Sequence, residues 1–322
     1  MDSHSPRPRA LTQALLARWP LPATAANADK ESRGHVLVVG GCSEMPGAVL
    51  LAATAALRAG AGKLTMASPR SVAQGLALAM PEARVIGLDE TRSGTMAARG
   101  AARLAHLGDK VGAVVVGPGM VDEARSTAFV QALLPHFRDS VVVLDAYAMS
   151  AVGRKAFDQP IVITPHCGEI AHLMGGSKED VLSAPLRYAR SAAARWGACV
   201  ALKGADTYIV QADGAALHFK GGTPGLGVSG SGDTLAGIIA GIAARGTSGL
   251  QACAWGVVLH ALAGRALSRG HGPLGLLARE LPGQVPRLMH ALAGRVQSDG
   301  RGISSKRDAP QARKALQQPH RR

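Results

Sequence analysis

The feature that most constrains the fold is a series of short apolar runs that alternate with longer segments of helical character. Seven runs occur, at residues 35–41, 63–68, 83–88, 113–119, 140–146, 161–166 and 199–205. Runs of this length separated by helices are typical of buried strands in a mostly parallel sheet with helices on both faces. The sequence therefore predicts an α/β fold, a three-layer α/β/α sandwich.

The segments between the runs predict helices at 47–59, 123–137, 181–196, 233–245 and 250–268, and an earlier one at about 11–19. Two further strands, 207–211 and 216–220, flank an Asp213-Gly214 pair that favours a hairpin. The sheet is thus expected to end in an antiparallel edge hairpin. Aromatic residues make up only 3 % of the chain, so small aliphatic side chains must build a closely packed core.

The formal net charge of +14 is partly concentrated at the C-terminal end. From Arg301 onward, seven basic residues face one acidic residue, which gives +6 in the last 22 residues. This stretch lacks apolar periodicity, as disordered segments do. We expect an N-terminal extension over 1–34, one domain over 35–296 and a basic disordered tail over 297–322.

Several classes of protein are disfavoured by composition. The four cysteines are scattered and form no C-x-x-C pair, which argues against a zinc site or a disulfide framework. Neither a signal sequence nor a run of 18 apolar residues is found, so a cytoplasmic protein without membrane association is predicted. A non-catalytic nucleic-acid-binding protein would fit the charge, but the scarcity of aromatic residues for base stacking argues against this alternative.

Glycine and polar residues follow the predicted strands. They are Gly40-Gly41, residues 117–119, Asp145, residues 164–166 and residues 203–207. Because open α/β sheets bind ligands beyond the carboxyl ends of their strands, these residues are expected to converge on one rim.

A glycine-rich loop at 221–232 runs directly into the helix predicted from Asp233. Glycine lets backbone N–H groups approach an anion, and the helix N-terminus adds partial positive charge. Gly230, Ser231 and Gly232 are therefore predicted to form an anion hole. Asp233 follows at once and could act as a base beside a transferring phosphoryl group, or could only cap the helix.

Two other nucleotide-binding motifs fit less well. Gly225, Gly227 and Gly230 have the spacing of a dinucleotide fingerprint, but that motif needs an acidic residue about 20 positions later. No Asp or Glu occurs from position 234 to 279. A Walker A loop is excluded at 60–64 because the hydroxyl residue after Lys63 is missing.

Over residues 35–293 the sequence resembles the nucleotide-dependent NAD(P)H-hydrate dehydratases of the ribokinase-like superfamily. Seven motifs of that family occur in order, namely Gly40-Gly41-x4-Pro46-Gly47-Ala48, ALRAGAGKLTMAS (56–68), VVGPGM (115–120), VVLDAYAM (142–149), TPHCGEIAHLMG (164–175), ALKGADTYI (201–209) and the loop that ends in GSGD. The resemblance implies a ribokinase-like fold and a hydro-lyase that repairs hydrated NADH and NADPH.

The resemblance also implies roles for individual residues. Ala48, Gly119, His166 and Asp233 would contact the hydrated nicotinamide nucleotide. The AMP portion of the phosphoryl donor would contact Lys203, Gly204, Ala205, Asp206, Thr207 and Gly232. Asp233 would deprotonate the C6 hydroxyl of the hydrate, and phosphate would then leave. Bacterial members use ADP and animal or fungal members use ATP, with Mg²⁺, to which Glu169 is a candidate ligand unless it caps a helix.

Five positions depart from the family pattern. Met45 stands where Tyr is usual, Tyr147 and Ser150 replace an Asp and an Asn, and Val228-Ser229 replaces Thr-Gly. A small-molecule kinase of the same superfamily, which phosphorylates a hydroxymethyl group of a vitamin precursor, is the alternative enzyme. The resemblance further implies a homotetramer, and an epimerase on a separate chain because 34 leading residues are too few to encode one.

Overall fold

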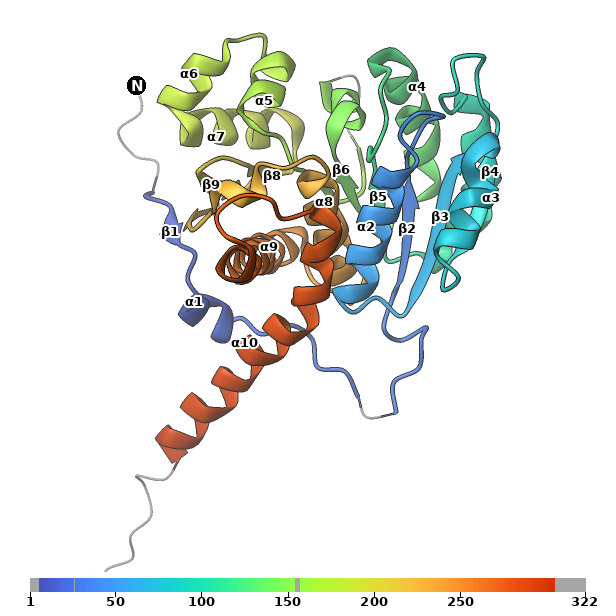
Figure 1. Ribbon diagram of the computed structural model, residues 1–322. Helices are drawn as coiled ribbons and strands as arrows, with labels where there is room; N and C mark the ends of the chain where they lie inside the picture. The colour runs from blue at the N-terminus through green and yellow to red at the C-terminus, as the bar shows by residue number, and fades with distance from the viewer. Residues whose placement is uncertain (1–5, 26, 154–156, 305–322) are drawn as a thin grey trace, which may run out of the picture.

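The computed structural model describes residues 6–25, 27–153 and 157–304, and its centre is one ten-stranded sheet (Figure 1). The strand order is β1-β10-β9-β8-β7-β6-β5-β2-β3-β4. The strands are β1 (Arg9–Ala10), β2 (His35–Val39), β3 (Lys63–Pro69), β4 (Arg84–Leu88), β5 (Ala113–Val116), β6 (Val141–Leu144), β7 (Ile161–Ile163), β8 (Cys199–Leu202), β9 (Asp206–Val210) and β10 (Ala216–Lys220). Only β9 runs antiparallel to its neighbours, which confirms the mostly parallel sheet and the antiparallel hairpin β9–β10.

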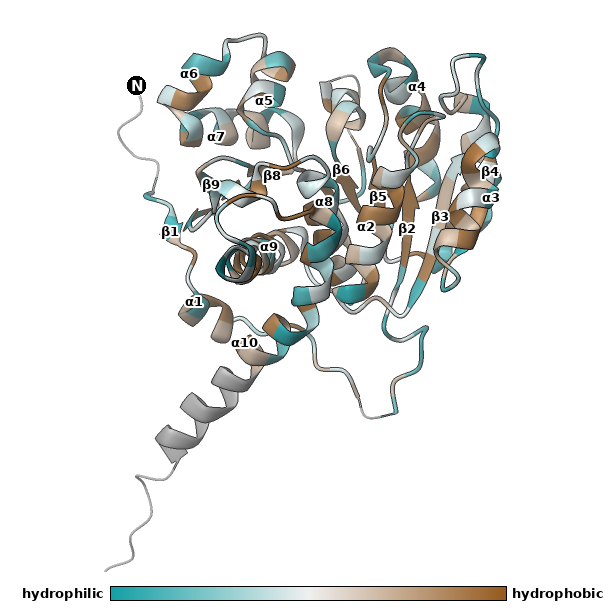
Figure 2. Ribbon diagram, in the orientation of Figure 1, coloured by the Kyte–Doolittle hydropathy of each residue, from teal (hydrophilic) through white to brown (hydrophobic). Residues whose placement is uncertain are grey.

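Alternate residues of the central strands enter two separate cores. Val36 and Val38 of β2 face one core, whereas Leu37 and Val39 face the other. This alternation follows from the two-residue period of a strand, and it requires that both faces be covered. The predicted three-layer α/β/α sandwich is thereby confirmed, and Figure 2 shows the apolar strands inside it.

The first face is covered by α1, α2, α3, α8, α9 and α10, and the second by α4 to α7 with three 3-10 segments. The α-helices are α1 (Gln13–Ala17), α2 (Gly47–Arg58), α3 (Arg70–Ala79), α4 (Glu123–Leu133), α5 (Cys167–Met174), α6 (Lys178–Ser183), α7 (Pro185–Trp196), α8 (Ser231–Ala243), α9 (Gly249–His271) and α10 (Leu281–Ser304). The 3-10 segments are η1 (Ala98–Lys110), η2 (Leu134–His136), η3 (Ala146–Gly153), η4 (Pro224–Leu226) and η5 (Ala278–Glu280).

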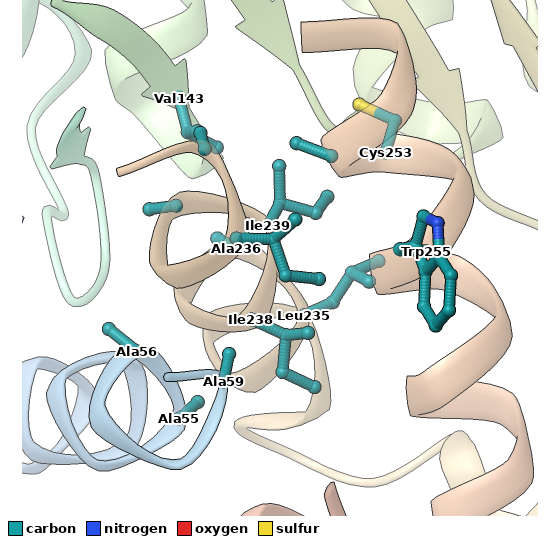
Figure 3. Packing of buried hydrophobic residues seen from close by; sticks show 14 of the residues in the cluster. Ala55, Ala56, Ala59, Val143, Leu235, Ala236, Ile238, Ile239, Cys253 and Trp255 are labelled. Atoms are coloured by element: carbon teal, nitrogen blue, oxygen red, sulfur yellow. The ribbon is translucent and has the colours of Figure 1, made fainter. Parts of the chain in front are cut away.

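Helices α2 and α8 pack closely because α8 carries glycines where they cross. A Cβ on Gly237 would lie 2.1 Å from the carbonyl oxygen of Ala52, and one on Gly241 would lie 2.4 Å from that of Ala56. Two larger residues of α8, Leu235 and Ile238, lie between the alanines of α2 and Trp255 of α9 (Figure 3). The composition, rich in small aliphatic residues, thus allows helices to pack closely around the few buried aromatic rings, of which Trp255 is the largest.

The helix predicted at 181–196 is two helices, α6 and α7, and this prediction was wrong in detail. Pro185 begins α7, and the residue before a proline is disfavoured in the helical region. Ala184 accordingly has φ −144° and ψ 55°, which ends α6.

The N-terminal segment packs on the domain instead of extending from it. Strand β1 pairs parallel with β10. The hairpin β9–β10 was expected to form the edge of the sheet, but β1 lies outside it. Leu16 is fully buried, and the carbonyl oxygen of Trp19 accepts a hydrogen bond from Nε1 of Trp255 at 2.9 Å. Figure 1 shows this segment following the β9 edge down to α1, beside α10.

The C-terminal helix α10 continues to Ser304, into the stretch for which disorder was predicted from position 297. A helix whose first turns are packed propagates readily, because each added residue gains one hydrogen bond. Residues 305–322 of the predicted tail lie outside the described residues.

Among the described helices, α9 alone is long and apolar enough to cross a bilayer by length and composition. Its most apolar window is 78 % buried inside the fold, as in the core helix of a globular domain.

Candidate active site

The first turn of α8 forms an anion-binding site at the carboxyl edge of the sheet. The turn that starts the helix needs Gly230, whose φ is 85° and whose Cβ, if present, would lie 2.4 Å from Cδ1 of Leu51. The backbone N–H groups of Gly232 and Asp233 find no acceptor in the described chain. Because these donors add to the helix dipole, the turn is suited to hold a phosphoryl group.

A cleft of about 750 Å³, here called the first cleft, opens over this turn. Its polar lining includes Asp145, His166, Glu169, Lys203, Gly232 and Asp233. Its apolar wall includes Phe219, Leu226, Val228, Leu235, Val257 and Ala261. A mostly apolar cavity with a few converging polar groups is typical of a small-molecule site.

An ion pair lies beneath the helix turn. Nζ of Lys203, which follows β8, lies 3.2 Å from Oδ1 of Asp145, which follows β6. Thr164, after β7, donates to the same oxygen at 2.8 Å. A Cβ on Gly232 would lie 3.3 Å from the Lys203 ammonium, so only glycine lets the helix backbone approach this pair without crowding.

The charges around Asp233 set its protonation. Burial and repulsion from Asp145, partly offset by Lys203 and reinforced by Glu169, raise the pKa of Asp233 to about 7. Burial alone would lower the pKa of Lys203, but Asp145, Glu169 and Asp233 outweigh it and raise that pKa. A carboxyl group with a raised pKa beside a buried cation is typical of a catalytic acid or base, and a helix cap needs no such shift.

His166 both caps α5 and faces the cleft. Its Nδ1 accepts the N–H groups of Gly168 and Glu169 at 3.0 and 3.1 Å, while Glu169 accepts the N–H of His166 at 2.7 Å. Since Nδ1 accepts, the proton of the neutral ring lies on Nε2. The side chain is 60 % exposed and lines the cleft, with Nε2 3.6 Å from Oε2 of Glu169. The capping and ligand-binding interpretations of His166 are therefore compatible.

The residues of the predicted nucleotide site lie mainly in the first cleft. Lys203, Gly204, Ala205, Thr207 and Gly232 line it, whereas Asp206 is not among the lining residues. Asp206 instead accepts a hydrogen bond from Nε2 of His218 at 2.8 Å. Of the predicted anion hole, Ser231 and Gly232 line the cleft, and Gly230 shapes the turn behind them.

Ala48 and Gly119 lie together, but neither lines the first cleft. A Cβ on Gly119, where φ is 72°, would lie 3.1 Å from Cβ of Ala48 and 2.4 Å from the carbonyl oxygen of Met45. The structure thus brings these two residues to each other, and brings His166 and Asp233 to the cleft.

His260 is a cleft residue that the sequence analysis missed. It is 9 % exposed on α9, and its Nε2 lies 3.0 Å from Oγ of Ser231. Burial lowers the pKa of His260 to about 4, so the ring is neutral at pH 7 and fixes the first turn of α8 by a neutral hydrogen bond. The signal that could have identified it is its place as the one polar residue in the apolar stretch 252–264 of α9.

A second cleft of about 450 Å³ shares His166 and Glu169 with the first. Its other lining residues are Met120, Glu123, Ala146, Tyr147, Met149, Ser150, Gly168, His172 and Leu173. His172 and Glu123 pair across it at 3.1 Å. Two of the departures from the family pattern, Tyr147 and Ser150, therefore lie in one cavity.

A metal ion held entirely by protein side chains is not indicated, because the described residues contain no group of three His, Cys, Asp or Glu side chains placed to bind one. Mg²⁺ in nucleotide sites usually takes one or two carboxylates and completes its shell with phosphates and water. Asp145 and Glu169, both at the first cleft, fit that weaker requirement, and Glu169 also caps α5 through Oε2, which accepts the N–H of His166.

A sequence profile of the NAD(P)H-hydrate dehydratase family matches residues 36–287. The chain belongs to this family. Its members include an ADP-dependent (S)-NAD(P)H-hydrate dehydratase of Xanthomonas campestris pv. campestris, which is 48 % identical over 284 residues, or 88 % of this chain and 97 % of the relative. The resemblance drawn from the sequence is thereby confirmed, as is the predicted enzyme class, a hydro-lyase.

Two further family members bear on the site and on partners. A bifunctional NAD(P)H-hydrate repair enzyme of Moorella thermoacetica is 37 % identical over 290 residues. These residues are 87 % of this chain and 54 % of the Moorella protein. The ADP/ATP-dependent NAD(P)H-hydrate dehydratase of Bacillus subtilis, crystallised with ATP and Mg²⁺, has a TM-score of 0.77 at 28 % identity and covers 88 % of this chain and 98 % of its own. A ribokinase-like superfamily protein of Enterococcus faecalis has a TM-score of 0.76 at 26 % identity and covers 88 % of this chain and 96 % of its own, which confirms the predicted ribokinase-like fold.

Proposed function

We propose that this chain dehydrates the S epimer of NADH hydrate and NADPH hydrate, with ADP as phosphoryl donor and Asp233 as catalytic base. The observation that carries the proposal is the place of Asp233. Its carboxyl group has a pKa of about 7. It lines the first cleft beside Gly232, whose N–H group has no acceptor in the described chain. An acceptor hydroxyl and a donor phosphate can meet there.

The first step is transfer of the β-phosphoryl group of ADP to the C6 hydroxyl of the hydrate. Asp233 takes the hydroxyl proton as the oxygen attacks phosphorus, and the bond to AMP breaks. A base of pKa about 7 is partly ionised at neutral pH and still strong enough to accept the proton, which is the optimum for general-base catalysis.

The charge that develops on the transferring group needs fixed positive partners. Lys203 and the N–H groups of the α8 turn supply them without reorganisation, since the Lys203 ammonium is already held by Asp145 at 3.2 Å. His260 contributes by holding Ser231, and thereby the turn itself.

The second step is elimination. The lone pair of the ring nitrogen expels phosphate from C6, and loss of a proton from C5 restores the dihydropyridine. The products are NAD(P)H, AMP and phosphate, and the hydroxyl oxygen leaves in the phosphate.

The donor is assigned to the end of the first cleft lined by Gly204, Ala205 and Thr207, against the apolar wall around Val228 and Val257. ADP is proposed because the Xanthomonas relative is named as ADP-dependent. Mg²⁺, with Glu169 and Asp145 as protein ligands, would neutralise phosphate charge when bound. Roles of Ala48 and Gly119 in holding the hydrate, and of Asp206 in holding AMP, remain part of the proposal.

The proposal is tested by incubating the protein with S-NADHX, ADP and Mg²⁺ while following the near-ultraviolet absorbance of NADH and the release of phosphate. One NADH, one AMP and one phosphate should form per ADP consumed. Phosphorylation of a thiazole or pyridoxine alcohol, with S-NADHX unchanged, would instead identify a superfamily kinase.

An epimerase that interconverts the two hydrate epimers is the expected functional partner, and the name of the bifunctional Moorella relative supports the pairing of two repair activities. We further propose a homotetramer in the cytoplasm. Light scattering of the purified protein tests the tetramer.

A further inference from the structure

We propose that the second cleft binds the adenosine end of NADH hydrate, with Tyr147 as the residue on which the adenine ring stacks. This inference rests on the proposed function, because it names where the remote half of that substrate lies. Tyr147 would then be a determinant of substrate affinity.

The arrangement of the two clefts leads to this assignment. The donor nucleotide and the reacting ring must both reach Asp233, which lies in the first cleft. The rest of a dinucleotide therefore has to leave that cleft. His166 and Glu169 border both cavities, so a substrate passing these two residues enters the second cleft directly.

Tyr147 is available for a ligand. It is 44 % exposed, and its hydroxyl has no hydrogen-bond partner among the described residues. A large aromatic ring left open in a concave site presents a face for stacking, and base–aromatic stacking is tolerant of the exact base.

The remaining walls suit the edge of a purine and a ribose. Met120, Met149 and Leu173 supply apolar surface, and the Ser150 hydroxyl is likewise unpaired within the described chain. Glu123 and His172, which pair at 3.1 Å, add a carboxylate group and an imidazole ring to the lining. Lys and Arg are absent from the described lining, so this cavity suits the adenosine end of NADH hydrate better than that of NADPH hydrate, which carries a 2′-phosphate.

The test compares S-NADHX with the hydrate of reduced nicotinamide mononucleotide, which lacks the AMP half, in the presence of ADP. Tyr147→Ala should lower kcat/KM for S-NADHX about 5- to 30-fold, as expected for loss of one stacking contact. The truncated hydrate should react with the same kcat/KM in both proteins, and the KM for ADP should be the same. Tyr147→Phe, which keeps the ring, should recover most of the loss with S-NADHX.

Leu182→Ala is the matched control, since Leu182 is 58 % exposed and lines neither cleft. An unchanged kcat/KM for S-NADHX in Tyr147→Ala, or an equal loss with both hydrates, overturns the proposal. If the wild-type protein dehydrates neither hydrate, the proposed function fails instead. The subsite is then judged by calorimetric titration with NADH, whose affinity must fall in Tyr147→Ala for the assignment to stand.

Discussion

Replacing Asp233 by Asn should stabilise the ligand-free protein at alkaline pH while it removes the catalytic base. The folded protein raises the pKa of this carboxyl group from 3.8 to about 7. Between these two values the folded state holds a proton that the unfolded chain has lost, so the free energy of unfolding falls as pH rises. Above pH 7 the ionised carboxylate of Asp233 therefore lowers the free energy of unfolding.

The size of the effect follows from the shift. About three pKa units correspond to about 4 kcal/mol in full. The part expressed between about pH 5 and pH 8.5 is about 3 kcal/mol, because some of the cost has already appeared at pH 5. The Asn side chain cannot ionise, so the variant should lack this slope.

Urea unfolding of both proteins at a series of pH values measures the difference directly. Asp109→Asn, the same chemical change at an exposed position near the end of η1, serves as the control. The wild-type curve should fall relative to the Asp233→Asn curve by about 3 kcal/mol over this range. Parallel curves would refute the argument that Asp233 is held in a site that disfavours its charge.

Other substitutions test the parts around the base. Gly232→Ala would place a Cβ 3.3 Å from the Lys203 ammonium, and calorimetry should show ADP affinity reduced by roughly tenfold; unchanged affinity would remove the helix turn from the donor site. Lys203→Met would leave the buried Asp145 without its partner, so denaturation should show a loss of about 3–5 kcal/mol, and a stable variant would contradict the ion-pair account. Gly237→Val would drive a side chain into the Ala52 carbonyl group, so unfolding should become easier by at least about 1–3 kcal/mol; normal stability would mean that α2 can move aside.

The sheet could be predicted from the sequence because the pattern that marks each strand is local. Each buried strand is a short apolar run, and the two-residue alternation of Val36 and Leu37 between two cores is inherent in strand geometry. The glycine-rich turn before Asp233 could be recognised for the same reason. The break at Pro185 was visible in the sequence but was outweighed by the helical character on both sides.

Contacts between distant residues could not be predicted in this way. His260 meets Ser231 only because α9 packs on α8, and the shared cavity of Tyr147 and His172 depends on the packing of η3 against α5. The raised pKa of Asp233 likewise requires Asp145 and Glu169 to be near it in space. Strand β1 pairs with β10 across most of the chain, and two residues carry no periodicity that could reveal it.

The central claim is that Asp233 is a base and not merely the first acidic residue of a helix. Its most direct test is the turnover of Asp233→Asn with saturating S-NADHX and ADP, alongside calorimetric titration with ADP. The account predicts turnover at least about a hundredfold below wild type, with the variant folded and still binding ADP. Turnover close to that of the wild-type protein would contradict it and leave Asp233 as a helix cap.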